Sequence, residues 1–353
     1  MTDEFDYKNA PKVMETRNLC KWFEQKYGIA DRLSGKAKKY VKAVNNVSIQ
    51  IYKGENLGLV GESGCGKSTL ARTMLRLYNP TKGSILLGEK DITRLKGEEL
   101  RKIRPSMQMV FQDPYSSLNP RMTVYEILAE MLSVHHIVPK DKIPERVKEL
   151  LDMCGLGMEA ADRFPGEFSG GQRQRVGIAR ALSLNPEFII ADEPVSALDV
   201  SIQAQIINLL GELQRSLNLT ILFISHDLHV VHYITHRIVV MYLGSVVEQG
   251  RTEEIFQQPL HPYTDVLIKA TPKLNPLDKT MDYAITGEPP SPVDIPTGCV
   301  FHPRCIRCKE KCKTEVPALR EIFPGRFVAC HYPLSEDFPA EQKGASADAG
   351  KTV

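Results

Sequence analysis

A glycine-rich loop between a β-like run and a helix-like run constrains the fold of this 353-residue chain more than any other feature. The stretch GESGCGKST occupies residues 61–69 and follows the apolar run ENLGLV. Glycines at this spacing let backbone N–H groups turn inward around phosphates, while Lys67 reaches the terminal phosphates and Ser68 offers a hydroxyl to Mg²⁺. The pattern predicts a nucleotide site made by Gly61, Glu62, Ser63, Gly64, Cys65, Gly66, Lys67, Ser68 and Thr69.

Two further apolar runs, rich in β-branched residues, predict buried parallel strands. EFIIADE covers residues 187–193 and LTILFISHD covers residues 219–227, with the pattern of an amphipathic helix between them. Alternation of buried strands and helices is typical of an α/β core with a parallel sheet.

The first of these runs ends in two adjacent carboxylates. Asp192 can hold Mg²⁺ through its water shell, and Glu193 can polarise the water that attacks a γ-phosphate. Taken alone, an apolar strand that ends in Asp-Glu is more often structural than catalytic. The stretch FSGGQRQR, residues 168–175, adds a serine at a predicted helix N-cap with two glycines behind it, which is a ready anion site.

Three more short motifs complete the set. Gln112 lies in VFQDP, SALD covers residues 196–199, and His226 lies in ISHD. With the glycine loop, FSGGQ and IIADE in this order, the chain resembles an ABC-type ATPase cassette over roughly residues 13–254. The resemblance implies an α/β fold with a RecA-like core, a helical subdomain and an antiparallel β subdomain.

The resemblance and a change in composition predict three parts of the chain. The ATPase domain is expected at residues 12–258, with its helical subdomain at about 113–185. Prolines recur after Gly250, so residues 259–335 are expected to form a small Cys-rich C-terminal domain. Residues 336–353 are small and polar, which predicts a disordered tail.

Roles for individual residues follow from the resemblance rather than from spacing. Gln112 would sense Mg²⁺ and the γ-phosphate, Glu193 would be the catalytic base, and His226 would contact the γ-phosphate. The implied Mg²⁺ ligands are Ser68, Gln112 and Asp192.

Two other features of the implied site depend on the partner subunit and on the alignment. The resemblance implies that a head-to-tail dimer forms, in which the γ-phosphate of the opposite subunit is bound by Ser169, Gly170, Gly171 and Gln172. Adenine would stack on Phe23, with Tyr40 as the alternative, because the polar insertion at residues 24–40 makes the alignment ambiguous.

Charge and hydropathy narrow the function classes. With 45 basic and 43 acidic residues the net charge is only +2, which lacks the strongly basic footprint of a nucleic-acid binder. No apolar run approaches the roughly 18 to 20 residues that cross a bilayer, and the acidic start MTDEFDYKNA has no signal-peptide pattern. The chain is therefore expected in the cytosol, with membrane association only through a partner.

Four stretches narrow the resemblance to one class of transporter. GESGCGKSTLAR, MVFQDPYSSLNPRMTV, HPYTDVLIKA and GCVFHPRC look like the ATP-binding subunits of oligopeptide and dipeptide importers, over the chain to about Pro333. VFQDPYSSLNPR is similar to the second of the two non-identical cassettes that these importers use.

That resemblance implies an ATPase that powers peptide import. Its expected partners are a sister ATP-binding subunit in a heterodimer, two permease subunits and an extracytoplasmic solute-binding protein, which would place it at the cytoplasmic face of the membrane. Nickel, glutathione or another small solute is the alternative cargo. A soluble regulatory or repair ATPase that shares the cassette is the rival from another class.

Five of the eight cysteines gather within 32 residues near the C-terminus. In a reducing compartment such a group favours metal ligation over disulfides. The importer family links a 4Fe–4S cluster to the positions that match Cys299, Cys305, Cys312 and Cys330, which leaves Cys308 as the extra one. A zinc site with four cysteines is the alternative, since Cys305 and Cys308 form a CxxC pair.

Cys65 raises a separate question because it lies inside the glycine loop. A thiol at a helix N-terminus can be acidified and reactive, or it can simply fill a variable loop position. Protection from alkylation by ATP would distinguish these two interpretations.

Overall fold

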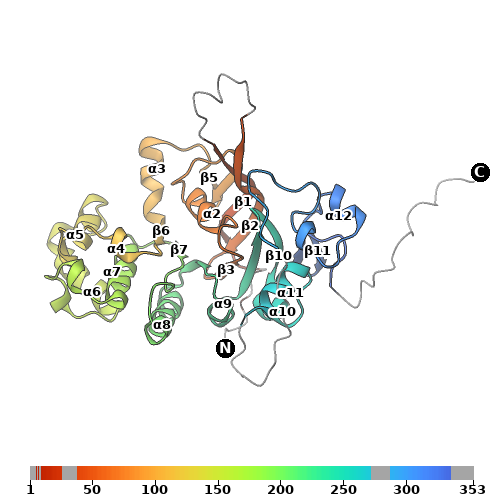
Figure 1. Cartoon of the computed structure of the whole chain (residues 1–353). Helices are drawn as coiled ribbons and strands as arrows, with labels where there is room; N and C mark the ends of the chain where they lie inside the picture. The colour runs from red at the N-terminus through yellow and green to blue at the C-terminus, as the bar shows by residue number, and fades with distance from the viewer. Residues whose placement is uncertain (1–4, 6, 8, 26–37, 272–286, 335–353) are drawn as a thin grey trace, which may run out of the picture.

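The computed structural model describes residues 5, 7, 9–25, 38–271 and 287–334, which form two β-sheets with helices around them (Figure 1). The larger sheet has the strand order β11-β12-β10-β9-β3-β8-β7-β6, and the smaller has the order β2-β1-β4-β5. The predicted tail at residues 336–353 lies outside the described residues, as does most of the predicted insertion at residues 24–40.

Parallel strands form one side of the larger sheet, from β9 to β6. Their bounds are β3 Asn56–Val60, β6 Met107–Val110, β7 Phe188–Asp192, β8 Thr220–Ile224 and β9 Arg237–Tyr242. Every residue of β3, β7 and β8 is buried, as expected for parallel strands with both faces covered. The predicted α/β core is therefore confirmed.

Antiparallel strands complete the larger sheet at its other edge. β10 Ser245–Arg251 pairs with β9, and β11 Arg320–Phe323 forms a hairpin with β12 Arg326–Val328. β12 pairs with β10, so the C-terminal segment continues the sheet of the cassette. The boundary predicted between residues 258 and 259 is therefore not a boundary between sheets, because a short hairpin from beyond it completes the edge of β10.

The smaller sheet packs over the helix that follows the glycine loop. Its strands are antiparallel and have the bounds β1 Lys12–Glu24, β2 Tyr40–Tyr52, β4 Lys82–Leu87 and β5 Lys90–Asp91. Met14, Ile49 and Ile85 from this sheet share one buried cluster with Leu70 of helix α2 Lys67–Met74. The two sheets thus hold α2 and the loop before it between them.

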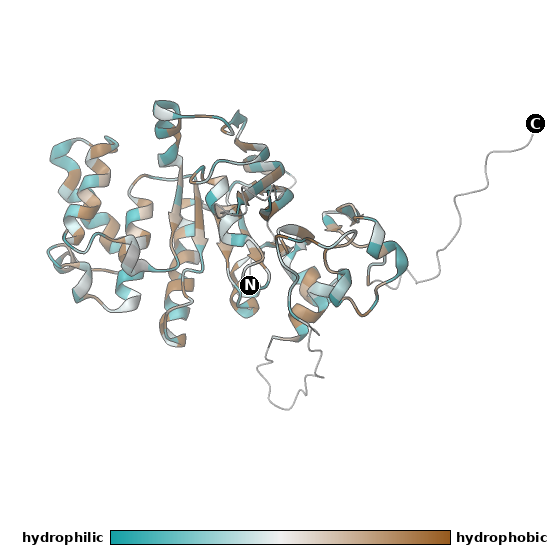
Figure 2. Ribbon diagram, turned by 45° about the horizontal axis from the view of Figure 1, so that its top comes forward, coloured by the Kyte–Doolittle hydropathy of each residue, from teal (hydrophilic) through white to brown (hydrophobic). Residues whose placement is uncertain are grey.

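A group of helices lies apart from the smaller sheet, at the left of Figure 1. It comprises α4 Pro114–Ser117, α5 Val124–Val134, α6 Ile143–Met153 and α7 Gly170–Leu182, within the span predicted for a helical subdomain. In Figure 2 the helices on this side alternate hydrophobic and hydrophilic residues, the pattern of amphipathic helices. Their apolar faces meet at Leu128, Leu150 and Val176, all of which are buried.

The remaining helices flank the sheets or belong to the C-terminal segment. Their bounds are α3 Gly97–Ile103, α8 Val200–Leu217, α9 Leu228–Ile234, α10 Thr252–Gln257, α11 Pro262–Lys269 and α12 Glu310–Thr314. Across the part of the chain that the structure describes, no helix has both the length and the apolar character needed to cross a membrane.

Candidate functional site

The glycine loop connects β3 to α2, in the order that the sequence predicts. Gly61 and Gly66 have φ angles of 148° and 107°, which residues other than glycine rarely adopt. A Cβ atom at Gly61 would overlap the carbonyl oxygen of Met241, and one at Gly66 would overlap that of Ala43. The backbone of the loop therefore passes so close to two neighbouring strands that only glycine fits.

The ammonium of Lys67 reaches back across the loop. It donates to the carbonyl oxygen of Gly61 over 2.7 Å and to that of Glu62 over 3.0 Å, and the side chain is buried. Ser63 and Thr69 belong to the same segment, Ser63 exposed and Thr69 partly buried in the first turn of α2. A cation held here together with the first N–H groups of α2 suits a phosphate chain.

The structure does not support an acidified thiol at Cys65, one of the two interpretations that the sequence left open. Cys65 is 5% exposed, and burial raises the pKa of its thiol although Lys67 lies nearby. The desolvation of a thiolate here outweighs the attraction of the ammonium. Cys65 therefore acts as a small packed residue in the loop.

Ser68 and Asp192 bring the loop helix to the end of β7. The hydroxyl of Ser68 donates to Oδ1 of Asp192 over 2.9 Å, and Asp192 is 2% exposed. Burial raises the pKa of the Asp192 carboxyl, which the hydrogen bond from Ser68 partly offsets. A hydroxyl beside a carboxylate supplies the oxygen ligands that Mg²⁺ prefers.

Three residues are predicted to act on the γ-phosphate, and two of them, Gln112 and His226, contact the third, Glu193. Gln112 donates to Oε2 of Glu193 over 2.9 Å, and Nδ1 of His226 lies 3.4 Å from Oε1. The three residues follow the carboxyl ends of the neighbouring parallel strands β6, β7 and β8, where ligands of open α/β sheets bind. Glu193 has a φ of 47°, an uncommon conformation for a non-glycine residue, of the kind that clusters at functional sites.

The predicted trans-acting residues lie at the start of α7, in the helical group. Ser169 is the N-cap: its hydroxyl accepts from the N–H of Gln172, and the Gln172 side chain accepts from the N–H of Ser169. Gly171 is buried, and a Cβ atom there would overlap Ile202. Gly170 starts the helix while Ser169 stays exposed, so this N-terminus is open to a ligand.

The two candidates for adenine stacking lie at the same end of the β1–β2 hairpin. Phe23 pairs with Val41, and Glu24 pairs with Tyr40. Consecutive residues of a strand point to opposite faces, so Phe23 and Tyr40 face opposite sides of the sheet. The ring of Phe23 packs edge-on against Tyr78 with centroids 5.5 Å apart, whereas Tyr40 is 37% exposed.

Four of the C-terminal cysteines surround one small cavity. Cys299, Cys305, Cys312 and Cys330 line it, while Cys308 is not part of the lining. Burial raises the pKa of Cys305 to about 11 and that of Cys330 to about 12. The positions that the family links to ligands thus converge from residues up to 31 apart, and the same cysteine is left out.

The four cysteines supply the thiol donors that a thiolate-bound group needs, but their sulfur atoms are not grouped closely enough to hold a single metal ion. Four thiols around one cavity suit an iron–sulfur cluster chemically. Within the described ranges, no three His, Cys, Asp or Glu side chains are grouped so that they could hold one metal ion. Both the 4Fe–4S cluster and the zinc alternative therefore stay predictions.

Two C-terminal residues touch the glycine loop, a contact that the sequence did not reveal. The guanidinium of Arg304 forms an ion pair with Glu62 over 2.9 Å, and the hydroxyl of Tyr263 accepts from the N–H of Glu62 over 2.8 Å. Both residues belong to stretches that look like importer sequences, HPYT and FHPRC. Those stretches were the available signal, although neither indicates by itself what its residues touch.

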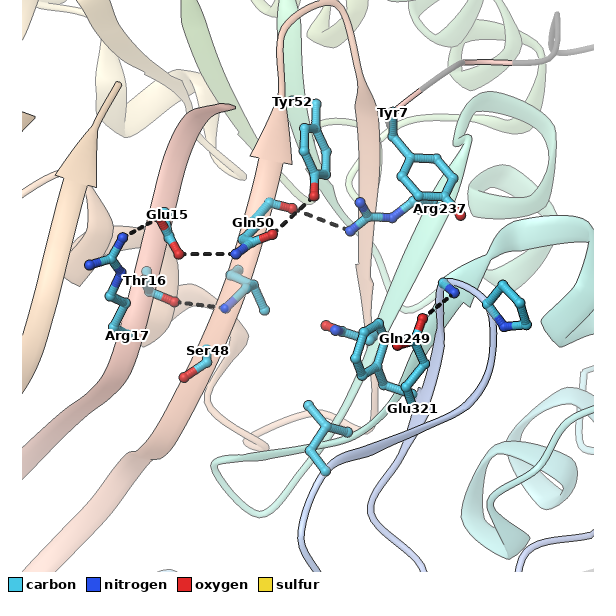
Figure 3. A pocket seen from close by; sticks show the side chains of 15 residues that line it. Tyr7, Glu15, Thr16, Arg17, Ser48, Gln50, Tyr52, Arg237, Gln249 and Glu321 are labelled. Carbon is cyan, nitrogen blue, oxygen red and sulfur yellow. Dashed lines mark hydrogen bonds and ion pairs between the residues drawn. The ribbon is translucent and has the colours of Figure 1, made fainter. Parts of the chain in front are cut away.

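A larger cavity of about 620 Å³ lies where β1 and β2 meet β10 and the β11–β12 hairpin (Figure 3). Four of the polar side chains drawn there bind one another. Gln50 donates to Glu15, which also pairs with Arg17, and Tyr52 donates to Gln50. None of the loop or strand-end residues described above lines this cavity, so it is separate from the nucleotide site.

Comparisons with known proteins agree with this geometry. Residues 44–196 match the family described as ABC transporter, and residues 247–312 match the one described as oligopeptide/dipeptide transporter, C-terminal region. The oligopeptide transport ATP-binding protein AppF of Bacillus subtilis is 52% identical over 326 residues, which cover 92% of this chain and 98% of AppF. A putative peptide import ATP-binding protein of Brucella ovis is 51% identical over 290 residues, which cover 82% of this chain and 92% of that protein.

A solved structure shares the fold of the cassette. The ATP-binding cassette MJ0796, described as dimeric in a post-hydrolysis state with ADP and Pi, aligns with a TM-score of 0.59 and 31% sequence identity. The alignment covers 68% of this chain and 98% of that one.

Proposed function

Since the chain belongs to the family of oligopeptide ABC transporter ATP-binding proteins, we propose that it binds ATP at the glycine loop and hydrolyses it at Glu193. It is the ATP-binding subunit of an ABC transporter for peptide import, and its ATPase activity is coupled to that import. It works with membrane permeases.

The observation that carries the proposed chemistry is the contact of Gln112 and His226 with one carboxylate, Glu193. Water bound by Glu193 would attack the γ-phosphorus of ATP. Glu193 accepts the proton of that water, the bond from the γ-phosphorus to the bridging oxygen breaks, and ADP and phosphate form. His226 supports the γ-phosphate while Lys67 holds the phosphate chain.

Ser68, Asp192 and Gln112 would hold the Mg²⁺ that accompanies ATP. When bound, this ion neutralises charge on the β- and γ-phosphate oxygens. Adenine stacking is assigned to Phe23, since its ring is already held by Tyr78, with Tyr40 as the alternative.

The signature residues at the start of α7 would act on the nucleotide of another subunit. Ser169 is exposed at a helix N-terminus that lies in the helical group, whereas the loop helix α2 lies beside the smaller sheet (Figure 1). The similar cassette MJ0796 is described as a dimer, which supports a head-to-tail pair. We infer a sister ATP-binding subunit, two permease subunits and an extracytoplasmic solute-binding protein, with this chain at the cytoplasmic face of the membrane.

The cysteines around the small cavity would hold a 4Fe–4S cluster through Cys299, Cys305, Cys312 and Cys330. Such a cluster would supply a covalent centre for a segment that has few apolar residues of its own. Anaerobic purification with assays for iron, sulfide and visible absorption tests this; stoichiometric zinc in a colourless protein would replace the cluster with the zinc alternative.

The proposed function is tested in the assembled transporter, reconstituted with its permeases and binding protein. The Glu193→Gln variant should keep ATP binding and lose ATP hydrolysis and peptide uptake together, because the amide cannot accept the proton. Hydrolysis at the parental rate would remove Glu193 as the base. Uptake of nickel or glutathione but not peptide would reassign the cargo.

A further inference from the structure

Glu62 of the glycine loop is bound at its side chain and at its backbone by residues from the C-terminal segment. Nη1 and Nη2 of Arg304 lie 2.9 and 3.2 Å from the two carboxylate oxygens of Glu62, a two-pronged contact. The hydroxyl of Tyr263 accepts from the N–H of Glu62 over 2.8 Å. The loop residue is therefore fixed in position and in orientation from outside the cassette motifs.

Arg304 is itself rigidly supported. Its side chain is 7% exposed, and its Nη1 also lies 3.3 Å from the hydroxyl of Tyr242. The rings of Tyr242, Tyr263 and Phe301 are fully buried and pack on one another with centroids 4.7 to 5.4 Å apart. A buried guanidinium is costly without an anion, so Glu62 is the group that makes this position of Arg304 favourable.

Movement of Glu62 would reach the phosphate-binding lysine directly. The ammonium of Lys67 donates to the carbonyl oxygens of Gly61 and Glu62. The Gly61 carbonyl belongs to the peptide whose N–H Tyr263 binds, and the Glu62 carbonyl lies on the residue whose side chain Arg304 binds.

The C-terminal segment also contacts the strand β2 beside the other end of the loop. The N–H of Lys42 donates to the carbonyl oxygen of Pro292 over 3.0 Å. The next residue, Ala43, has the carbonyl oxygen against which Gly66 packs so closely that no Cβ fits. The segment thus touches the loop at Glu62 and the strand that bounds it at Gly66.

We propose that Arg304 and Tyr263 are positioning residues of the nucleotide site, which set the affinity for ATP and ADP by holding Glu62. This inference rests on the proposed function and adds that the C-terminal segment controls the loop. Cys305 directly follows Arg304, so the cysteine cavity adjoins the residue that holds the loop.

The test measures binding of a fluorescent ADP analogue to the full chain by titration, together with ATPase activity in the assembled transporter. Arg304→Gln and Glu62→Gln should each raise Kd by about tenfold, with kcat at saturating ATP changed much less. The double variant should be no weaker than either single variant, because both remove one interaction. If the two single variants each raise Kd and their effects on the binding free energy add in the double variant, the proposal is wrong.

Tyr263→Phe guards against a failure of folding, since it removes only the hydroxyl from a buried ring. It should raise Kd several-fold with unchanged far-UV circular dichroism. The matched control is Lys313→Gln, which removes an exposed ion pair with Glu310 in the same segment without touching the loop, and it should bind like the parent.

The outcomes separate this inference from the proposed function. Lys67→Ala should abolish binding whether or not Arg304 matters, and normal binding by Lys67→Ala would overturn the nucleotide site itself. If Lys67→Ala loses binding while Arg304→Gln and Tyr263→Phe keep the parental Kd, the nucleotide site stands and the positioning role is wrong.

Discussion

Ser68 donates a hydrogen bond to Asp192 over 2.9 Å, although 124 positions separate the two residues in the chain. Ser68 lies in the first turn of the loop helix and Asp192 ends a central strand, so the fold alone brings them together. Their contact marks the place where Mg²⁺ would join the nucleotide to the sheet.

Asp192→Asn should weaken nucleotide binding only when Mg²⁺ is present. The amide keeps the hydrogen-bonding shape but not the negative charge that attracts the ion, and we expect a loss of roughly tenfold or more in Mg²⁺-dependent affinity. Titrations with Mg²⁺ and with EDTA measure the difference. Equal weakening under both conditions would show that Asp192 supports the loop rather than the ion.

Substitutions at two glycines of the loop should differ in severity. Gly66→Ala places a Cβ on the carbonyl oxygen of Ala43, whereas a Cβ at Gly64 meets no atom within 4 Å. Both residues have positive φ, so Gly64→Ala should cost about 1 kcal/mol of strain, and Gly66→Ala should cost more and abolish nucleotide binding. Denaturant unfolding and titration with ADP check both; equal effects would contradict the overlap argument.

Cys65 should react slowly with iodoacetamide at neutral and mildly alkaline pH. Burial raises its pKa, so the thiolate is scarce below the ordinary thiol pKa and increases only as the pH rises beyond it. Mass spectrometry of timed samples measures the rate, and the same chain in denaturant is the control. Fast labelling of the folded protein at pH 7 that ATP prevents would show that the Cys65 thiol is acidified and reactive.

Cys305→Ser and Cys308→Ser should separate a ligand from a bystander. Cys305 lines the cavity with three other cysteines, and Cys308 lies outside it. Under anaerobic purification the Cys305→Ser variant should lose bound metal and have a lower melting temperature. The Cys308→Ser variant should keep the metal and the parental melting temperature. Metal loss in Cys308→Ser would favour the CxxC zinc alternative.

The sequence was sufficient to predict the core and most of the candidate site at the carboxyl ends of its strands. Apolar β-branched runs identified β7 and β8, and the motifs at their ends placed Glu193 and His226 where parallel strands finish. This worked because buried parallel strands leave a continuous apolar signature and because ligands bind at their carboxyl ends.

Contacts between distant segments were beyond sequence reasoning. Arg304 and Glu62 are 242 positions apart, and a single ion pair leaves no periodicity in either stretch. The burial of Cys65 was left open for a related reason, since it depends on packing against distant residues such as Met241, which shares its buried cluster. The pattern of side chains along the sequence indicates the local helix or strand. These contacts depend instead on how distant helices, strands and loops pack together.

The pairing of β12 with β10 has a practical consequence for anyone who shortens the chain. A truncation after residue 258 would strip the hydrogen-bonding edge of β10 and remove Arg326, whose guanidinium lies 3.1 Å from the fully buried carboxylate of Glu248. A bare strand edge invites association with other chains, and a buried charge without its partner destabilises the fold. The motifs of the cassette end before this point, but its solubility and integrity depend on a hairpin made some sixty residues later.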